Sequence, residues 1–531
     1  MSSPCVTEAS KKSGHFVTLR RLLITAWLAF ATIFVAGRVG SYGPNHGDVA
    51  IWIPMHEWMT RGATLYETVW DHKDWGFFWL SQPLYRLWGI EGLYFAGFLA
   101  VVALGAGVYL LVRPSMTPGG AASLAATGAV VYVSSPSFWS IFTENLGIGL
   151  VILAFGLLVR YPLLGGLTWS LAASVKVAGV GLFLLVLLGS TPFVYLNRDQ
   201  SGRVWTLRWL VRALVGFLAG LVGVITLAAA TGSLRGWLDV LSYNREYASS
   251  RGFPPDGSLL EAPFSFTRNA FLDVAQLGQH QLLFLMAMCV SVVGLSLLLV
   301  SQRRTLSHQA ARDPSPVQLL FLTSLLVFGS LLFTLSQRPS PQHWQYFVGP
   351  GVLLACILYA LLHSAESRNL GVMRVLGIGL LVLPLATSVL FDRTMLPRGI
   401  LDRGIALTYF TQGGIFGEEL ASAPPESTIA SFTINDERID VSRLPPGSTL
   451  ACPLIVQFPW YFPRYEQELL NCIESRPGLV VLGEEPWATE SLREEITSVI
   501  DQEYELCARA GSTHELWARA DVGCGFLDSS P

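Results

Sequence analysis

Long apolar runs, separated by short polar segments, recur along the chain from residue 22 to residue 391. The hydrocarbon core of a bilayer is about 30 Å thick and a helix needs about 20 apolar residues to cross it, so each run predicts a transmembrane helix. We predict about eleven such helices. They lie near residues 22–40, 91–112, 120–136, 146–160, 163–176, 178–196, 210–231, 279–301, 317–335, 344–363 and 373–391.

The region 163–196 fits either two short helices broken near Lys176 or one long span. Lys and Arg concentrate in the short cytoplasmic loops of membrane proteins. With a break near Lys176 and a cytoplasmic N-terminus, every strongly basic short segment lies on the cytoplasmic side, whereas a single span would move the later segments across. The charge pattern therefore favours the break. The basic residues concerned are Lys11, Lys12, Arg20, Arg21, Arg113, Arg160, Arg198, Arg203, Arg208, Arg212, Arg303, Arg304, Arg368 and Arg374.

Residues 392–531 do not continue this pattern. Runs at 450–456 and 478–482 predict strands, residues 461–473 predict a helix, and residues 503–520 predict a hairpin turning at Gly511-Ser512. An odd number of spans places this segment outside the cytoplasm. The sequence thus predicts an all-α polytopic protein of the plasma (inner) membrane with a small extracytoplasmic α/β domain. Its predicted parts are a cytoplasmic N-terminus (1–21), a transmembrane domain (22–391) with a large first outer loop (41–90), and the extracytoplasmic soluble domain (392–531).

Composition and charge agree with this division. Hydrophobic residues make up 51% of the chain and charged residues 14%, with a mean hydropathy of +0.47. The segment from Asp392 onward has 22 acidic and 10 basic residues, a net charge of −12, whereas the preceding part has 16 acidic and 25 basic residues, a net charge of +9. The basic residues are spread over short loops, which argues against a nucleic-acid partner. The sequence has neither a Walker loop nor a paired cysteine or histidine zinc motif.

Four of the seven cysteines lie in the predicted extracytoplasmic domain, namely Cys452, Cys472, Cys507 and Cys524. An even number of cysteines in an exported domain favours disulfides. Buried free thiols are the alternative. The sequence does not determine how the four would be connected.

The predicted first outer loop is dense in aromatic and ionisable residues. It has an acidic residue just past the first span, Asp48, then Gly…Leu-Tyr at 62–66, then an Asp-x-Lys element formed by Asp71 and Lys73. Its many tryptophans suit a membrane interface. A plain alternative is therefore an interfacial helical hairpin whose charges face water.

This order of residues resembles the GT-C superfamily of membrane glycosyltransferases, in particular its bacterial protein-mannosyltransferase and lipopolysaccharide-sugar (Rgt-like) members. The resemblance covers the membrane region and is specific in the loop. It implies a GT-C-like fold, a catalytic base at Asp48, and substrate binding by Asp71 and Lys73. Relatives often have proline after this lysine, where Asp74 stands here. They also often have a helix parallel to the membrane at the place that corresponds to Pro54. In this sequence Pro54 would begin that helix or kink it.

The resemblance implies an inverting hexosyl or pentosyl transfer from a polyprenyl-phosphate-linked donor to an acceptor hydroxyl on the extracytoplasmic face. A hydroxyl is a poor nucleophile, so a carboxylate within hydrogen-bond reach should accept its proton. The lipid phosphate leaves as an anion, and cationic groups or a divalent metal ion would stabilise its developing charge. Asp48 is the predicted base, with His46, Asp71 and Glu57 as alternatives. The sequence does not identify the acceptor, which can be a glycan, a lipid or a protein.

Three further groups lie at the predicted outer ends of spans. Glu144 is expected to bind acceptor, sugar or metal, or else to cap the helix together with Thr143. Lys176 lies within an apolar run and is expected to reach the lipid phosphate, or to extend to the interface. The guanidinium of Arg338 suits phosphate oxygens, and His343 could bind phosphate or sugar. Arg338 and His343 could instead serve as interfacial anchors.

Two other functions compete with this one. A multi-pass transporter or lipid flippase without transferase activity also needs many spans, but it would place ionisable residues near the midplane of broken helices. Here they gather at one face. The third hypothesis is a non-catalytic membrane scaffold whose tail binds cell-wall material.

The predicted orientation can be tested with a reporter that is active only outside the cytoplasm. The reporter should be active when it is fused after Asp48 and inactive when it is fused after Arg113, because the two positions are predicted on opposite sides. Activity in the reverse order would contradict the predicted topology.

Overall fold

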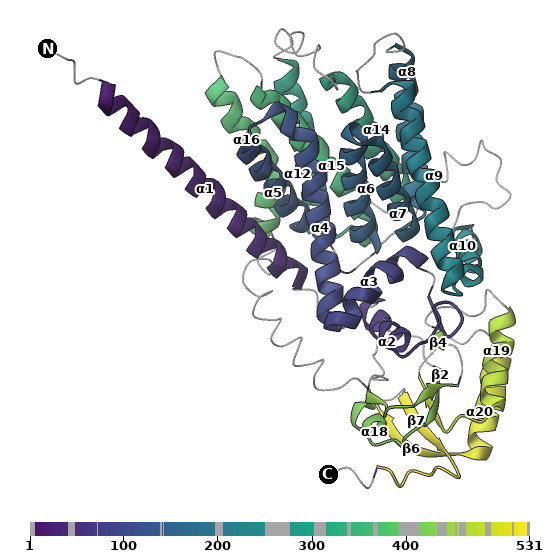
Figure 1. The fold of residues 1–531 in the computed structure, drawn as a ribbon. Coiled ribbons are helices and arrows are strands. Elements are labelled where there is room, and N and C mark those ends of the chain that lie inside the picture. The colour runs from purple at the N-terminus through teal and green to yellow at the C-terminus, as the bar shows by residue number, and fades with distance from the viewer. Residues whose placement is uncertain are drawn as a thin grey trace. The chain divides into compact units, whose positions relative to one another are not determined.

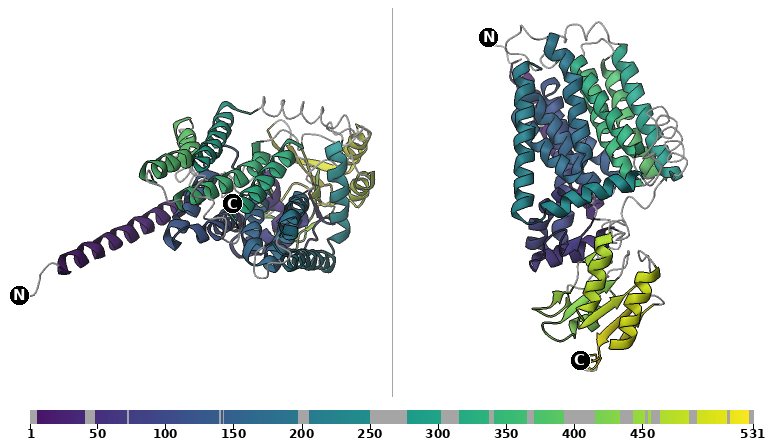
Figure 2. Two further views of the ribbon diagram at one scale, coloured as in Figure 1. Left: turned by 90° about the horizontal axis from the view of Figure 1, so that it is seen from above. Right: turned by 90° about the vertical axis from the view of Figure 1, so that its right-hand side faces the viewer.

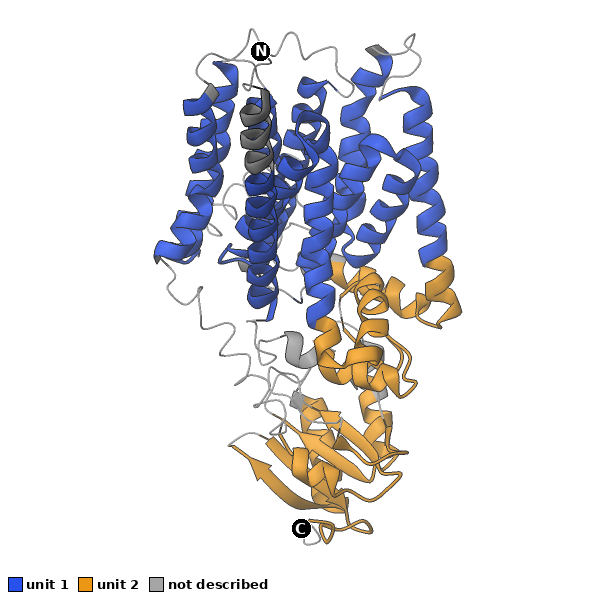
Figure 3. Ribbon diagram, turned by 60° about the vertical axis from the view of Figure 1, so that its left-hand side comes forward, with its two compact units in different colours: residues 1–41, 94–224, 251–400 blue, residues 42–93, 225–250, 401–531 orange. Residues whose placement is uncertain are grey.

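A computed structural model of the chain describes residues 6–40, 48–71, 73–138, 141, 143–196, 205–249, 277–301, 315–336, 341–364, 370–391, 415–432, 443–451, 454–455, 463–483, 490–511 and 514–527. The chain forms two compact units, each assembled from segments that are separate in the sequence (Figure 3). Unit 1 consists of residues 1–41, 94–224 and 251–400. Unit 2 consists of residues 42–93, 225–250 and 401–531.

Long apolar helices make up most of unit 1 (Figures 1 and 2), and each predicted span coincides with one of them. Two short 3-10 helices, η1 (Arg113–Ser115) and η2 (Pro341–Trp344), accompany them. The long helices are α1 (Val6–Gly40), α4 (Ile90–Val112), α5 (Pro118–Val133), α6 (Thr143–Arg160), α7 (Pro162–Val175), α8 (Ala178–Leu196), α9 (Leu207–Ala230), α12 (Gln279–Val300), α14 (Pro316–Ser336), α15 (Gln345–Ser364) and α16 (Leu370–Phe391).

The predicted break near Lys176 is confirmed, because α7 ends at Val175 and α8 begins at Ala178. Among the described residues, nine helices are long and apolar enough to cross a membrane, as expected of a multi-pass membrane protein. The two shorter apolar helices are α5, with 16 residues, and α7, with 14. At 1.5 Å per residue they are about 24 and 21 Å long, which is less than the thickness of the hydrocarbon core.

The outward faces of several helices are apolar. Leu23 of α1, Val222 of α9, Leu297 of α12 and Val375 of α16 each expose more than half of their surface. Contiguous apolar surface of this kind is unfavourable in water and suits contact with lipid. By contrast, α15 is buried along nearly its whole length, which makes it a central helix of unit 1.

Basic residues collect at one end of unit 1. Arg20 of α1 donates a hydrogen bond to the Thr117 hydroxyl at the start of α5 (3.3 Å), and Arg374 of α16 donates to the carbonyl of His363 at the end of α15 (2.9 Å). The charges of both arginines also act on His363. This clustering is what the predicted topology requires, and the side of the membrane that this end faces stays a prediction.

Glycines allow α4 and α6 to pack closely. A Cβ atom added to Gly149 of α6 would meet the backbone of Ala100, and one added to Gly156 would lie 2.8 Å from the carbonyl oxygen of Gly107. Small residues at such crossings let helix backbones approach in a membrane, where there is no hydrophobic force between helices to draw them together.

Unit 2 combines the first loop with the C-terminal segment. The loop forms α2 (Asp48–Thr60), β1 (Val69–Trp70) and α3 (Trp75–Trp88), and α10 (Leu234–Ser249) packs on it. Strand β1 pairs in parallel with β4 (Leu454–Ile455) of the C-terminal segment. The sequence places this loop in the transmembrane domain, whereas by its contacts it belongs to the unit that contains the tail.

The tail is a mixed α/β structure, as predicted. A five-stranded sheet has the order β3-β2-β5-β7-β6, with β2 parallel to β3 and β5 and the β6–β7 hairpin antiparallel. Helices α19 and α20 pack together beside it (Figure 1). The elements are α18 (Gly417–Ala421), β2 (Thr428–Phe432), β3 (Thr449–Leu450), α19 (Pro463–Glu474), β5 (Leu479–Leu482), α20 (Glu490–Glu503), β6 (Tyr504–Ala510) and β7 (His514–Arg519).

The predicted helix 461–473, the strand 478–482 and the hairpin are confirmed by α19, β5 and β6–β7. The prediction of one strand over 450–456 is wrong, because this run is split between β3 and β4, which belong to different sheets. Pro453, within the run, cannot donate a hydrogen bond to a continuous ladder. Strand β2 and helix α20 were not predicted from the sequence.

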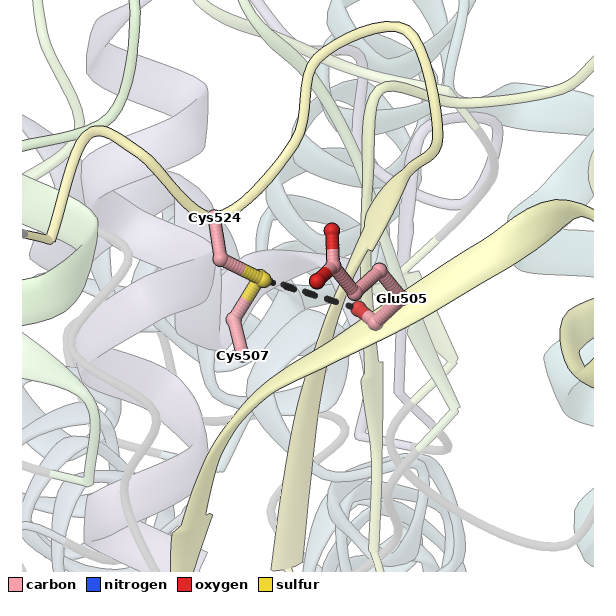
Figure 4. Close-up of a disulfide and its surroundings, with 3 residues drawn as sticks. All are labelled: Glu505, Cys507 and Cys524. Carbon is pink, nitrogen blue, oxygen red and sulfur yellow. Dashed lines mark hydrogen bonds between the residues drawn. A yellow bond between two sulfur atoms is a disulfide. The ribbon is translucent and has the colours of Figure 1, made fainter.

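The prediction of disulfides among the four cysteines of the tail is confirmed for one pair. Cys507 and Cys524 are bonded (Figure 4), with their sulfurs 3.6 and 3.9 Å from the carbonyl oxygen of Glu505. Cys507 lies where the register of the β6–β7 hairpin shifts, between Leu506 and Ala508. The bond thus fastens the segment after β7 to the edge strand β6. Cys472 is also disulfide-bonded, and Cys452 lies outside the described residues.

The α4–α6 crossing predicts a stability difference between two glycine substitutions. Gly149→Ala should lower the free energy of unfolding by about 1–3 kcal/mol, because the new methyl group overlaps the backbone of Ala100. Gly181→Ala is the matched control, since a Cβ there meets nothing within 4 Å. Thermal unfolding of the two purified variants in detergent measures the difference. Equal melting temperatures would contradict the close packing.

Candidate functional site

Three ionisable side chains from distant parts of the sequence meet within unit 1. Lys176 Nζ lies 2.9 Å from Glu144 Oε1, and His343 Nε2 lies 3.6 Å from the same oxygen. The Thr143 hydroxyl donates to the other carboxylate oxygen at 2.9 Å. The Glu144 side chain is 3% exposed, whereas those of Lys176 and His343 are 18% and 14% exposed. The carboxylate is therefore enclosed, and Lys176 and His343 form the more exposed side of the cluster.

The break between α7 and α8 positions the lysine. Lys176 has extended backbone angles (φ −151°, ψ 118°), and its N–H closes α7 by donating to the Ala172 carbonyl. The Trp169 indole donates to the Gly179 carbonyl in the first turn of α8 at 2.8 Å, which ties the two helices across the break. A largely buried ammonium is costly unless it is paired, and Glu144 supplies the pairing charge.

The N-terminal ends of three helices lie at this cluster and add positive potential to it. Glu144 lies in the first turn of α6, Lys176 comes just before α8, and His343 lies in η2, directly before α15. The N-terminus of a helix carries a partial positive charge that stabilises a nearby anion. The expectation that Glu144 lies near the positive end of a helix is therefore met, and the ion pair with Lys176 exists in addition to it.

A glycine lets α15 approach this cluster. A Cβ added to Gly147 of α6 would collide with the Tyr346 hydroxyl and lie 3.5 Å from Cβ of Lys176. The Tyr346 ring is fully buried and packs edge-on against Phe333 of α14. Gly147 thus sets the distance between α6 and the two segments that carry the cations.

A neutral polar chain lies beside the charged cluster. The Tyr132 hydroxyl is 3.2 Å from Asn145 Oδ1 and 3.1 Å from the side-chain amide of Gln345. The Gln345 atom nearest the hydroxyl is Oε1, so Tyr132 donates its one proton to Asn145 or to Gln345. Asn145 donates in turn to the Gly97 carbonyl at 3.2 Å. This chain joins α4, α5, α6 and α15.

In unit 2 the Asp-x-Lys element is buried. Asp71 is 1% exposed and accepts a hydrogen bond from the Trp52 indole at 2.7 Å, and Lys73 Nζ lies 6.0 Å from the centroid of the Trp52 ring. The Tyr66 hydroxyl donates to the Lys73 carbonyl at 2.7 Å. Burial and the nearby carboxylates of Asp74 and Asp71 raise the pKa of Tyr66 well above its usual value. The loop thus holds these charges in one fixed arrangement.

Asp74 shows how this chain departs from the proline of the resembling family. Its φ of −66° lies in the range that a proline ring imposes, so the backbone at this position is compatible with proline. Its side chain does not cap α3 and instead accepts a hydrogen bond from the Trp237 indole of α10 at 3.3 Å. The aspartate therefore attaches α10 to the loop, a bond that proline could not make.

Residue by residue, the described part of the chain brings Glu144, Lys176 and His343 together. Asp48 is the first residue of α2, and its side chain, like the whole of Arg338 and His46, lies outside the described residues. Glu57 is partly exposed and pairs with Arg61 at 3.4 Å. The expectation that Pro54 could begin α2 is wrong, because it lies in the helix interior.

A buried histidine in the loop was missed by sequence reasoning. His56 Nε2 lies 2.8 Å from the Ser81 hydroxyl, which donates its own proton to the Phe77 carbonyl. His56 Nε2 therefore carries the proton shared with Ser81. Complete burial lowers the pKa of His56 to about 3, so the ring is neutral. Nothing in the sequence marks His56, since a single histidine between apolar residues has no characteristic spacing.

Within the described ranges, no group of three or more His, Cys, Asp or Glu side chains could hold a metal ion. Glu144 and His343 form a pair of ligand types there, and Asp48, the other carboxylate considered for a metal, has no described side chain.

Comparison with known proteins finds a similar solved structure. No family model matches the sequence, and no curated protein matches it. Among solved structures, the chain is similar to ArnT from Cupriavidus metallidurans, whose crystal structure has undecaprenyl phosphate bound. The match has a TM-score of 0.48 and 12% identity, and covers 95% of this chain and 98% of ArnT. At this identity the likeness concerns the fold alone.

The low pKa of His56 predicts how stability depends on pH. The unfolded chain binds a proton on this ring below about pH 6.5, whereas the folded chain does so only near pH 3. The stability contributed by neutral His56 is complete above pH 6.5 and is lost as the pH falls toward 3, by up to about 1.4 kcal/mol per pH unit. His56→Gln should therefore flatten the melting temperature between pH 6.5 and 4. His280→Gln, at an exposed histidine, should leave the profile unchanged. A profile of His56→Gln as steep as the parent's would contradict the assignment.

Proposed function

We propose that the protein is an inverting GT-C-type glycosyltransferase that uses a polyprenyl-phosphate-linked sugar as its donor. The observation that supports this most directly is the meeting of Lys176, His343 and Glu144 from three distant segments of the membrane-embedded unit. A lipid phosphate stays at the end of the hydrocarbon region while its chain lies among the helices. Lys176, at the break between α7 and α8, and His343 offer the kinds of donor that bind such a phosphate.

In the proposed reaction the acceptor hydroxyl oxygen attacks the anomeric carbon of the sugar. The bond between that carbon and the phosphate oxygen breaks, and the electron pair leaves with the polyprenyl phosphate. Asp48 accepts the hydroxyl proton as general base. Lys176 and His343, together with Arg338, stabilise the charge that develops on the phosphate. Attack from the face opposite the phosphate inverts the anomeric configuration.

The loop of unit 2 has the complementary part in this proposal. Asp48 begins α2, and the hydrogen bond from Trp52, one helical turn later, fixes Asp71. Lys73 and Asp71 are proposed to bind substrate, with the indole-lined surroundings suited to stacking on a sugar ring. The proposed acceptor is a hydroxyl group of a glycan, a lipid or a protein on the extracytoplasmic face.

The direct test is a transfer assay in membranes with a panel of labelled polyprenyl-phosphate hexoses and pentoses. Asp48→Asn should lower the turnover about 100-fold or more, because the amide cannot accept the proton. Glu67→Gln is the matched control, since Glu67 is an exposed acid in the same loop and should leave transfer unchanged.

The outcomes separate the competing functions. Loss of transfer in Asp48→Asn at normal expression supports the enzyme, and full activity of this variant would contradict its role as base. Movement of the labelled lipid across the membrane without any transfer would favour a flippase, which the broken helix also allows. The same assay with a chelator shows whether a divalent ion takes part.

A further inference from the structure

We propose that Glu144 is an internal counter-anion that occupies the cationic position of Lys176 and His343 until the phosphate of the donor displaces it. This inference deepens the proposed function and rests on it. It gives Glu144 a positioning role at the phosphate subsite and assigns it no contact with sugar, acceptor or metal.

The carboxylate of Glu144 contacts donors of the kinds that also bind phosphate. One oxygen of Glu144 faces both Lys176 Nζ and His343 Nε2, at 2.9 and 3.6 Å, and the other accepts the Thr143 hydroxyl. Phosphate oxygens bind the same donors: an ammonium, an imidazole N–H and a hydroxyl. Glu144 therefore accepts the interactions of the same donors that would otherwise contact a phosphate.

The exposure of the three side chains gives the direction of the exchange. The carboxylate is 3% exposed, whereas Lys176 and His343 are 18% and 14% exposed. Lys176 and His343 are thus more accessible to a ligand than the carboxylate of Glu144 is. Lys176 can turn its ammonium from Glu144 toward the ligand by rotation of its flexible stem.

Charge balance explains why such a counter-anion is useful. A lysine left without a partner in a low-dielectric place is strongly unfavourable, so Glu144 stabilises the cluster before the donor arrives. The donor is a phosphodiester, and the product is a phosphomonoester that carries additional negative charge. Glu144 repels the product and recaptures Lys176, so it is expected to promote release of the polyprenyl phosphate.

The test measures binding of a polyprenyl monophosphate to the purified full-length protein in lipid nanodiscs. Glu144→Gln should bind this lipid about tenfold more tightly, a change of about 1.4 kcal/mol, because the competing charge is removed while the volume is kept. The affinity of Lys176→Gln for this lipid should be lower than that of the parent by at least about tenfold. In transfer assays, Glu144→Gln should also show stronger inhibition by added polyprenyl phosphate.

Two further variants make the result decisive. Glu144→Asp keeps the charge but withdraws it by one methylene group, so its affinity should fall between those of the parent and Glu144→Gln, and it serves if the amide variant does not fold. Glu503→Gln removes an ion pair of similar length, 2.8 Å to Arg476, in the tail and should leave the affinity unchanged.

An affinity of Glu144→Gln equal to or weaker than that of the parent would overturn the inference, since a purely structural or substrate-binding acid gives that result. Absence of lipid-phosphate binding by the parent would overturn it as well. Failure of the proposed function looks different: the parent would bind the lipid, Glu144→Gln would bind it more tightly, and neither would transfer sugar.

Discussion

The Glu144–Lys176 ion pair lies where the apolar interior of unit 1 is interrupted, and the arrangement of several helices depends on it. A lysine between two apolar helices needs a compensating charge, and the carboxylate that provides it comes from the first turn of α6. The pair therefore fixes α6 against the α7–α8 break. Gly147 and the Tyr132–Asn145–Gln345 chain then bring α15 and α5 to the same place. Removal of either charge would leave the other enclosed at a high cost in free energy.

The need to pair a buried charge also relates the structure to the proposed chemistry. A protein that binds a lipid phosphate must keep cations ready in a low-dielectric place when no phosphate is bound. A permanent, strong ion pair would make those cations unavailable, and bare cations would be unstable. An enclosed carboxylate with more accessible cations around it lies between these extremes. In such a site the carboxylate stabilises the cations before the ligand binds, and the phosphate takes its place beside them afterwards.

Unit 2 uses a different means to hold charged groups in place. Its acidic residues are fixed by indole N–H groups, from Trp52 to Asp71 and from Trp237 to Asp74. An indole has a large apolar ring and one N–H donor. It can therefore shield a carboxylate from water and donate a hydrogen bond to one of the carboxylate oxygens. Because Trp237 belongs to α10 and β1 pairs with β4 of the tail, two other segments of the chain stabilise the loop that contains Asp48.

The sequence by itself determined the positions of the apolar helices, the break at Lys176 and the α/β nature of the tail. These features follow from local properties: the length of an apolar run, the side on which Arg and Lys collect, and the period of a strand or helix. It also marked Glu144, Lys176 and His343, because a charged residue next to an apolar run is conspicuous. Only the tertiary structure decided that these three meet, that Asp71 and Asp74 are held by indoles, that 450–456 is divided between two sheets, and that His56 is buried and neutral. Contacts between residues far apart in the chain depend on how helices pack, and no pattern within a single segment contains that information.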